Sequence, residues 1–501
     1  MVSQIDAQQI WLLSPQLSMV ILGFLVLGLD LATRRRNLVS AVAIIGLVVP
    51  ALFTFSLATN LLVSNRPTTG FFGMLVVDQY ALFFDFLFLV IGLGVMLLSL
   101  GYMEKNLRAT PGEFYAIILF SLTGMMLMAS TGELISIYIS LELTSIPLYV
   151  LAGLSRSDTR SAEAAIKYVL LGAMSSAILL YGMALLYGVT GTTDLVGIMN
   201  ALTNPKTGIL SGNLMLLAGA VFIFVGLGFK ISAVPFHMWA PDIYEGAPTP
   251  ATLFFSVGSK AAGFAALLRI FVFGGVSALS GTNLWVMVAI IAAVTMTLGN
   301  VIALLQTNIK RMMAYSSIGQ AGYLLVGLAA VMIHNTPAGL LGLLTFLAVY
   351  IVTNIGTFAG IIGVADATGK ENIRDFDGLG RRTPWIAFGM GLCLLSLAGI
   401  PPQAGFLSKL FIFFAAWQEG SGLTWLVVLG LLNSAIAIVY YVNVLWRMFA
   451  IEPAKRDRLG MPTSVNVVMT LAVFGIIALT VAFGILLNHL GGSASSLFTF
   501  H

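Results

Sequence analysis

Charged residues are scarce in this sequence. Of its 501 residues, 9% are Asp, Glu, Lys or Arg, against about 25% in an ordinary soluble domain. No polar block is long enough to form a soluble domain, which argues against catalysis by a water-exposed domain. Hydrophobic residues make up 59%, and the mean hydropathy is +1.00. The composition therefore predicts a membrane protein throughout the chain.

Cysteine is nearly absent, and so is a basic leader. The single Cys393 can form neither an internal disulfide nor a thiolate cluster, which excludes iron–sulfur chemistry from this chain. The first dozen residues contain Asp6 but no Lys or Arg, so the first hydrophobic run is expected to stay in the mature protein. The net charge of +4 does not indicate a nucleic-acid partner, because the basic residues mark the ends of hydrophobic runs.

Hydrophobic runs long enough to cross a bilayer, about 20 residues each, recur along the whole chain. They predict an all-α polytopic membrane protein with about fourteen transmembrane helices. The twelfth run is too long for one straight helix. The predicted spans are 14–32, 38–61, 78–102, 114–131, 133–153, 162–189, 213–232, 249–273, 283–305, 311–332, 337–365, 384–418, 421–448 and 463–488.

The basic residues support this count. Taking every second loop, beginning with RRRN after the first span, collects seventeen of the 24 Lys and Arg residues. The opposite loops hold only Arg66 and Lys206. Because cytoplasmic loops collect Lys and Arg, the pattern predicts an even number of spans with both termini on the outer side.

Several charged residues nevertheless stand inside predicted spans. Each costs about 2.5 to 3.5 kcal/mol at a helix centre on insertion scales, so each needs a compensating reason. Lys260 and Lys409 are too deep to reach the surface easily, and the short side chain of Glu142 is less able to do so. For Lys167 and Arg269, snorkelling or capping at a helix end is as plausible as a buried role. Asp85 and Glu133 fit boundary or packing positions better than a relay.

A Glu/Lys pair within the membrane can act as a proton switch. Burial favours the neutral forms of both side chains, whereas a close opposite charge favours their charged forms. Glu142 is the acid best placed inside a span to neutralise Lys230. Separating the two would therefore change whether the lysine holds or releases its proton.

Proline interrupts two of the spans beside a lysine. Pro235 and Pro241 follow Lys230, and Pro401 and Pro402 precede Lys409. Proline removes a backbone donor, and freed backbone groups at membrane depth need protein or water partners. Broken helices at corresponding places, five spans apart, indicate two inverted repeats. His237 is equally well explained as a relay member or as a boundary histidine. No second His, Cys or acidic residue lies nearby at the spacing of metal ligands, so the sequence does not indicate a metal site there.

Six segments resemble the antiporter-like membrane subunits of complex I. They occur in order and cover roughly residues 132–409: SLELTSIPLYVLAG, EAAIKYVLLGAMSSAILLYG, GLGFKISAVPFHMWAPDIYEGAPTP, GSKAAGFAALLRIF, TNIKRMMAYSSIGQAGY and SLAGIPPQAGFLSK. The resemblance implies fourteen helices with inverted five-helix repeats. It divides the chain into helices one to three (1–110), repeat one (111–275), repeat two (276–450) and a final helix (451–501).

The resemblance also implies roles for residues. Glu142 resembles the acid of span five, Lys230 its partner, Lys260 the central lysine and Lys409 the lysine of broken span twelve. Lys167 and His237 match the subunit N branch of the family, as does a lysine rather than a glutamate at 409. One departure is Gln320, where relatives often carry His. Gln cannot titrate, which puts a proton step at that position in doubt.

The resemblance implies a subunit of a redox-driven proton translocase, an NADH-quinone oxidoreductase. This chain would hold no cofactor, whereas NADH or another donor, FMN, iron–sulfur clusters and quinone would belong to partner subunits. Its partners would be other membrane subunits, including an antiporter-like neighbour, in a bacterial inner membrane. Two alternatives remain at this point: a subunit of a multisubunit cation/proton antiporter, or a passive structural subunit.

Overall fold

A computed structural model describes residues 6–33, 35–64, 66–106, 111–155, 158–203, 213–276, 283–334, 337–453 and 457–496. This part of the chain is almost entirely helical. Two short strands, β1 (Thr68–Gly70) and β2 (Leu75–Val77), form an antiparallel hairpin in which Thr69 pairs with Val76. The hairpin was not predicted from the sequence.

The helices follow one another along the chain with short connections. Their bounds are α1 (Ala7–Leu12), α2 (Ser14–Ala32), α3 (Arg36–Gly46), α4 (Val48–Ser64), α5 (Gln79–Asn106), α6 (Pro111–Ser130), α7 (Leu134–Ala152), α8 (Thr159–Thr190), α9 (Leu195–Thr203), α10 (Leu214–Lys230), α11 (Trp239–Gly246), α12 (Thr249–Phe254), α13 (Lys260–Leu268), α14 (Leu284–Ala303), α15 (Ile309–His334), α16 (Pro337–Thr368), α17 (Leu379–Arg382), α18 (Pro384–Ala398), α19 (Ala404–Gln418), α20 (Ser421–Phe449), α21 (Thr463–Val481) and α22 (Phe483–Ser496).

The predicted spans are confirmed. Within the described ranges, twelve helical segments are long and apolar enough to cross a membrane, and they correspond to every predicted span except the seventh and the twelfth. Those two are the shorter apolar helices α10, and α18 with α19. The predicted breaks are therefore also present: α10 ends at Lys230, and residues 399–403 separate α18 from α19.

Two further predicted spans are each divided into two helices. The predicted second span, 38–61, holds α3, which ends at Gly46, and α4, which begins at Val48. The predicted last span, 463–488, is not one helix, because α21 ends at Val481 and α22 begins at Phe483. Beyond Thr190, outside the predicted spans, the structure adds helix α9. A proline inside α7, Pro147, does not interrupt that helix. Proline position alone therefore does not decide where a membrane helix breaks.

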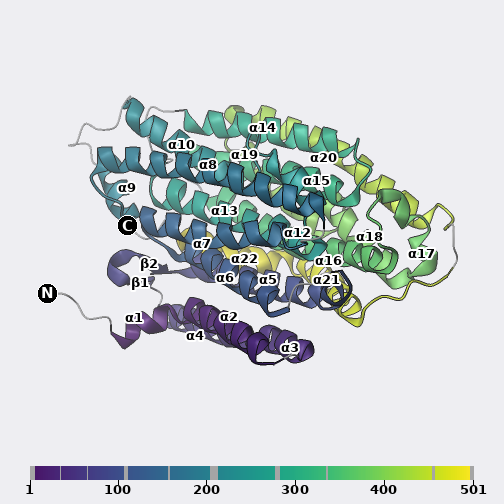
Figure 1. The fold of residues 1–501 in the computed structure, drawn as a ribbon. Helices are drawn as coiled ribbons and strands as arrows, with labels where there is room; N and C mark the ends of the chain where they lie inside the picture. Colours follow the sequence, from purple (N-terminus) through teal and green to yellow (C-terminus); the bar gives the residue numbers. More distant parts are fainter. Residues whose placement is uncertain are drawn as a thin grey trace.

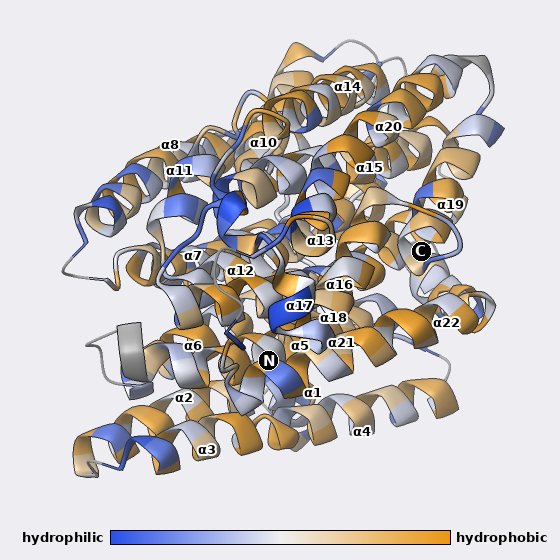
Figure 2. Ribbon diagram, turned by 90° about the vertical axis from the view of Figure 1, so that its right-hand side faces the viewer, coloured by the Kyte–Doolittle hydropathy of each residue, from blue (hydrophilic) through white to orange (hydrophobic). Residues whose placement is uncertain are grey.

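The long helices lie side by side and alternate in direction (Figure 1). One end of the bundle carries α17 and the start of α3, and the other carries α1, α9 and the hairpin. Figure 2 looks onto the first end, where α17 and the beginning of α3 are hydrophilic and the helices behind them are mostly hydrophobic. We call this the basic end, because Arg35, Arg36, Lys310, Arg381 and Arg382 lie at helix ends there.

The middle of the bundle is formed by segments that are shielded from lipid. Every residue of the segment 249–273 is buried, and so are most residues of α15 and α16. Within 249–273, the π-helical stretches Phe255–Ser259 and Arg269–Phe273 flank α13. Because π-helical turns often occur at functional sites, polar side chains in this buried segment are candidates for a functional role.

Candidate functional site

Lys230 is the last residue of α10, at the point where this helix breaks. Its side chain is 4% exposed, and its Nζ has no hydrogen-bond partner among the described residues. The Nζ instead faces two aromatic rings, 5.6 Å from the centroid of Tyr149 and 5.9 Å from that of Tyr168. Cation–π attraction of this kind reaches about 2 kcal/mol in a desolvated site. The rings therefore offset only part of the cost of burying an ammonium group.

The break after Lys230 is held by protein groups. The indole Nε1 of Trp239 donates to the carbonyl of Phe229 at 2.7 Å, and the backbone N–H of Val234 donates to the hydroxyl of Thr295 at 3.0 Å. Ser232 adopts the left-handed region with φ of 60°. Freed backbone groups at membrane depth must be paired, so these contacts explain how the chain leaves the helix beside Lys230.

Glu142 lies on α7 near Lys230, but the two do not form a direct ion pair among the described contacts. Its carboxylate accepts a hydrogen bond from the hydroxyl of Ser176 on α8, and that hydroxyl also lies 3.1 Å from the hydroxyl of Tyr138. Tyr149, about two helical turns beyond Glu142 on α7, presents its ring to Lys230. The face of α7 that carries Glu142 therefore also contacts Lys230 through Tyr149.

Lys260 follows the first π-helical stretch and is 1% exposed. Its Nζ donates to the hydroxyl of Ser317 on α15 at 2.5 Å and also to the Ser317 carbonyl. The same hydroxyl lies 2.9 Å from that of Tyr350 on α16 and 3.4 Å from that of Tyr244 on α11. Lys260 therefore ends in a network of hydroxyl groups from three further helices, each of which can donate or accept a hydrogen bond.

Lys409 lies on α19, and its ammonium caps the other half of the broken helix. Its Nζ donates to the carbonyls of Leu397 and Ala398 at 2.7 and 3.3 Å. These are the last carbonyls of α18, where the helix dipole favours a positive charge. The Nζ also lies 4.8 Å from the centroid of the Tyr323 ring. The break between α18 and α19 therefore supplies the hydrogen-bond acceptors for the ammonium group of this lysine.

Gln320 connects the Lys409 site to the Lys260 site. Its amide Nε2 donates to the Leu397 carbonyl at 3.0 Å and to the Tyr441 hydroxyl at 3.3 Å. Tyr441 in turn is hydrogen-bonded to Ser316, the neighbour of Ser317 on α15. Buried polar contacts therefore extend from both lysines onto adjacent residues of α15. The sequence indicated Lys260 and Lys409 but not the serines and tyrosines beside them.

Lys167 does not join the buried lysines. Its side chain is 43% exposed and forms ion pairs with Glu163 and Asp242, both at 2.8 Å. Arg311 pairs with the other oxygen of Asp242 and with Glu245, both at 2.9 Å. Burial acts to raise the pKa of the Asp242 carboxyl, but the hydrogen bonds from Lys167 and Arg311 outweigh it and lower that pKa. Lys167 belongs to a half-exposed cluster of charges.

His237 lies in the broken segment after Lys230. It is half-buried, and among the described contacts no hydrogen bond or ion pair joins it to a buried lysine. Burial lowers the pKa of its imidazole, and a hydrogen bond with the Pro235 backbone opposes that effect. Within the described ranges, no group of three His, Cys, Asp or Glu residues could hold a metal ion.

Arg269 corrects one interpretation made from the sequence. Snorkelling was considered for it, but its side chain is fully buried. Its two terminal nitrogens bind both oxygens of Asp78 at 2.7 Å, and its Nε donates to the Ala129 carbonyl at 2.8 Å. The guanidinium also packs 4.6 Å from the centroid of the Tyr80 ring. The only signal in the sequence was that Asp78 and Arg269 stand at the same end of two spans.

The other acids noted in the sequence have structural surroundings. Glu133 caps α7 by accepting a hydrogen bond from the Ser136 backbone at 2.9 Å. Asp85 is buried, and the side chain of Gln16 donates to it at 3.5 Å. Both contacts agree with the boundary and packing roles expected for these residues.

Comparison with known proteins gives a consistent result. Residues 131–437 match the family described as NADH:quinone oxidoreductase/Mrp antiporter, transmembrane. NADH-quinone oxidoreductase subunit N 2 of Symbiobacterium thermophilum is 45% identical, over 83% of this chain and 82% of its own length. NADH-quinone oxidoreductase subunit N of Heliobacterium modesticaldum is 42% identical, over 95% of this chain and 96% of its own length.

A solved structure has the same fold. A chain of respiratory complex I from Thermus thermophilus, with bound aureothin, superimposes with a TM-score of 0.77. It is 30% identical in sequence, and the match covers 95% of this chain and 100% of that chain.

Proposed function

Because the chain belongs to the NADH:quinone oxidoreductase/Mrp antiporter transmembrane family, we propose that it is a proton-translocating membrane subunit of an NADH-quinone oxidoreductase, of the subunit N type. Relatives of that name align with nearly the whole chain. The chain contributes to the enzyme as a subunit of the translocase. NADH or another donor, FMN, iron–sulfur clusters and quinone belong to partner subunits.

One observation supports proton transfer above all others. Three lysines on three different helices, Lys230, Lys260 and Lys409, are each at most 4% exposed. A membrane protein retains such residues at a substantial cost in free energy, and ionisable residues inside the membrane mark ion or proton pathways. An ammonium group that loses and regains a proton can serve as a station on such a pathway, whereas a permanently charged group cannot.

The proposed route passes these lysines in order. A proton enters from the basic end through the break beside Lys230 and His237, moves to Lys260, and leaves beyond Lys409. The first two lysines are adjacent, because the hydroxyl of Ser259 lies 3.4 Å from the Lys230 carbonyl. The distance between Glu142 and Lys230 sets the proton affinity of this lysine. Lys167 lies in the charge cluster on the same side and would collect protons at the entrance.

The energies are sufficient for one proton. Moving one charge through 100 mV requires about 2.3 kcal/mol. A change of two units in the proton affinity of a lysine, expressed as pKa, corresponds to about 2.7 kcal/mol. Movement of the Glu142 charge relative to Lys230 couples two sites through a free energy of this kind.

We further propose the membrane in which the chain lies, its orientation and its neighbouring subunits. It lies in a bacterial inner membrane with the basic end inside and both termini outside. Its neighbours are another antiporter-like subunit and small membrane subunits. Helices α6 to α13 and α14 to α20 would form the two inverted repeats, each containing one broken helix with a lysine at the break.

The relay is tested in the assembled complex reconstituted into vesicles. Lys230→Gln and Glu142→Gln remove the two coupled charges while keeping similar side-chain volumes. We expect each to lower proton uptake by more than tenfold, as followed by a pH-sensitive dye, with the complex still assembled. Lys370→Gln changes an exposed lysine and should have no effect.

Two outcomes would favour the alternatives. Normal pumping in both variants, with intact assembly, would make this a passive structural subunit. Proton movement that depends on a Na⁺ or K⁺ gradient and not on quinone reduction would make it part of a cation/proton antiporter.

A further inference from the structure

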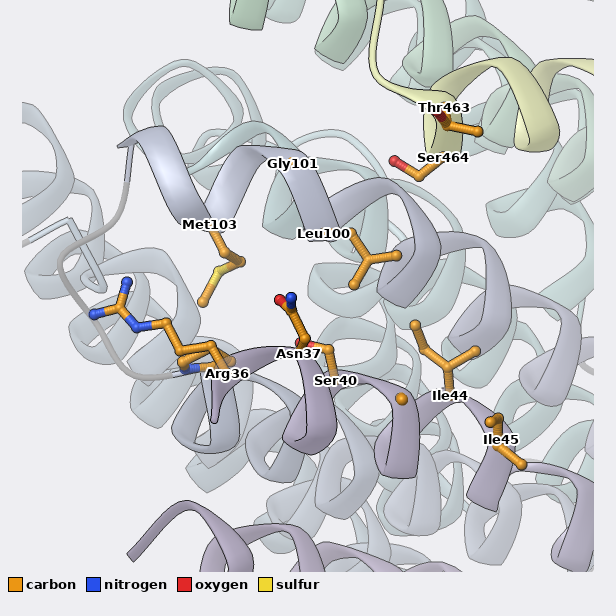
Figure 3. Close-up of a pocket in the computed structure, with 12 residues that line it drawn as sticks. Arg36, Asn37, Ser40, Ile44, Ile45, Leu100, Gly101, Met103, Thr463 and Ser464 are labelled. Atoms are coloured by element: carbon orange, nitrogen blue, oxygen red, sulfur yellow. The ribbon is translucent and has the colours of Figure 1, made fainter. Parts of the chain in front are cut away.

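A cavity of about 670 Å³ opens between α3, α5 and α21, away from the buried lysines. Figure 3 shows its residues: Arg36 and Asn37 on α3, Leu100 on α5, and Thr463 and Ser464 on α21. The volume is within the range of small-molecule sites, about 300 to 1,000 Å³. None of the contacts in the proposed proton route uses these residues.

The cavity is polar at one end. Among the described residues that line it, Arg36 at the beginning of α3 is the only charged one, and it forms no ion pair with another described residue. Asn37 extends from α3 toward α5, and Ser464 carries a hydroxyl on the opposite wall (Figure 3). A guanidinium with nearby amide and hydroxyl groups is a set of donors suited to a phosphate.

Ser40 adds a hydroxyl group to the polar end of the cavity. The residue is 7% exposed and lines the cavity. A hydroxyl group can donate a hydrogen bond to an acceptor bound there.

The rest of the lining is apolar. The cavity is also lined by Ile44 and Ile45 on α3, about one helical turn beyond Ser40. Leu100 on α5 lines it as well. Ile45 is 68% exposed, so this part opens toward lipid. The arrangement places a cation at the basic end and hydrocarbon toward the membrane middle, as in a phospholipid lying along the helices.

We propose that this cavity binds an anionic phospholipid, with the phosphate at Arg36, Asn37 and Ser40 and an acyl chain along Ile44, Ile45 and Leu100. A free phosphate ion would leave the apolar walls without a partner. None of the described lining residues is acidic, which favours an anionic headgroup, and basic sites between membrane helices attract such lipids. The proposal does not rest on the proton route.

The test uses the assembled complex in bilayers containing trace photoactivatable phosphatidylglycerol or phosphatidylcholine, each with the reactive group near the top of an acyl chain. We expect phosphatidylglycerol to label the peptides around residues 36–46 and 463–464 about fivefold more than phosphatidylcholine, as one basic contact predicts. Arg36→Gln should abolish this preference, whereas Arg36→Lys should keep it.

Arg35→Gln is the matched control, because Arg35 is the exposed neighbour that does not line the cavity. It should leave the preference unchanged. Equal labelling by both lipids in the wild-type complex would overturn the proposal, as would displacement of the label by millimolar inorganic phosphate. A photoreactive residue at Ile45 that captures a protein subunit in place of lipid would also overturn it and identify the cavity as a subunit contact.

Discussion

At the scale of the residue, the three lysines of the proposed proton route share a side chain but not an environment. Lys230 faces aromatic rings, Lys260 hydroxyl groups, and Lys409 the terminal carbonyls of a helix. Their common property is an amine that can exchange its proton. Arg269 is buried just as deeply, but it is locked by a bidentate carboxylate. An amine that can exchange its proton suits the route proposed for the lysines, whereas the paired guanidinium of Arg269 holds helices together.

Lys409→Arg tests this distinction. An arginine keeps the positive charge and can still donate to the Leu397 and Ala398 carbonyls, but its guanidinium does not release a proton. We expect the complex to assemble and its proton pumping, measured in vesicles during quinone reduction, to fall by more than tenfold.

Lys370→Arg, at an exposed position, is the control and should pump normally. Normal pumping by Lys409→Arg would show that the charge of this side chain, and not its proton exchange, is what the protein requires.

At the scale of the element, two kinds of helix irregularity organise the bundle. The breaks after α10 and between α18 and α19 expose backbone groups that side chains then pair. The second irregularity is the π-helical stretch that begins at Arg269. Arg269 pairs with Asp78 at the start of α5 and donates to the Ala129 carbonyl at the end of α6. Both irregularities depend on close contacts between helices.

Arg269→Gln should destabilise the protein strongly. Removing one partner of a buried ion pair leaves an uncompensated charge and costs about 3 to 5 kcal/mol. We expect a clear fall in the thermal midpoint of the purified complex in detergent.

Arg381→Gln is the comparison for this variant, because the Arg381/Glu452 pair is largely exposed, and such pairs contribute little. The double variant Asp78→Asn with Arg269→Gln should recover part of the loss. A double variant that is no more stable than Arg269→Gln would contradict the uncompensated charge as the cause.

Gly405→Ala tests the packing at the second break. A Cβ at Gly405 would lie 1.9 Å from the carbonyl oxygen of Ser396, so α18 and α19 would have to separate. Overpacking of this kind typically costs about 1 to 3 kcal/mol, and displacement of Lys409 should also reduce pumping.

At Gly28, by contrast, an added Cβ would meet no atom within 4 Å. Gly28→Ala should therefore leave thermal stability and pumping unchanged. Equal behaviour of the two variants would mean that α18 and α19 are not packed as closely as the structure shows.

At the scale of the whole molecule, alternating helices place the described ends of the chain at one face. Ser493 near the end of α22 contacts the Gln79 carbonyl at 3.2 Å, and Leu12 at the end of α1 packs in the same small cluster as Val77. The hydrophilic α17 and the beginning of α3 lie at the other face (Figure 2). A bundle with its charges distributed in this way has a defined orientation in the membrane.

Cysteine labelling tests this orientation. A membrane-impermeant maleimide should label Ser495→Cys in intact cells and Lys370→Cys only after the cells are opened. Both positions are exposed, whereas the native Cys393 is fully buried and supplies the unreactive background. The reverse pattern of labelling would place the basic end outside.

The sequence was sufficient to predict the spans, the two broken helices and the presence of Lys230, Lys260 and Lys409 inside or beside spans. Those features follow from local properties, because a helix must be apolar over the bilayer thickness, proline removes a backbone donor, and a charge at membrane depth stands out against its neighbours. Family resemblance added the expected roles of these residues.

Only the tertiary structure decided which side chains meet. Arg269 is paired with Asp78, Lys167 lies in a half-exposed charge cluster, and the Glu142 carboxylate accepts a hydrogen bond from Ser176. Many of these helices are apolar on nearly all faces, so periodicity does not show which face of each turns inward. That choice depends on packing against several helices at once, and it alone brings Lys260, Ser317 and Tyr350 together from three separate helices.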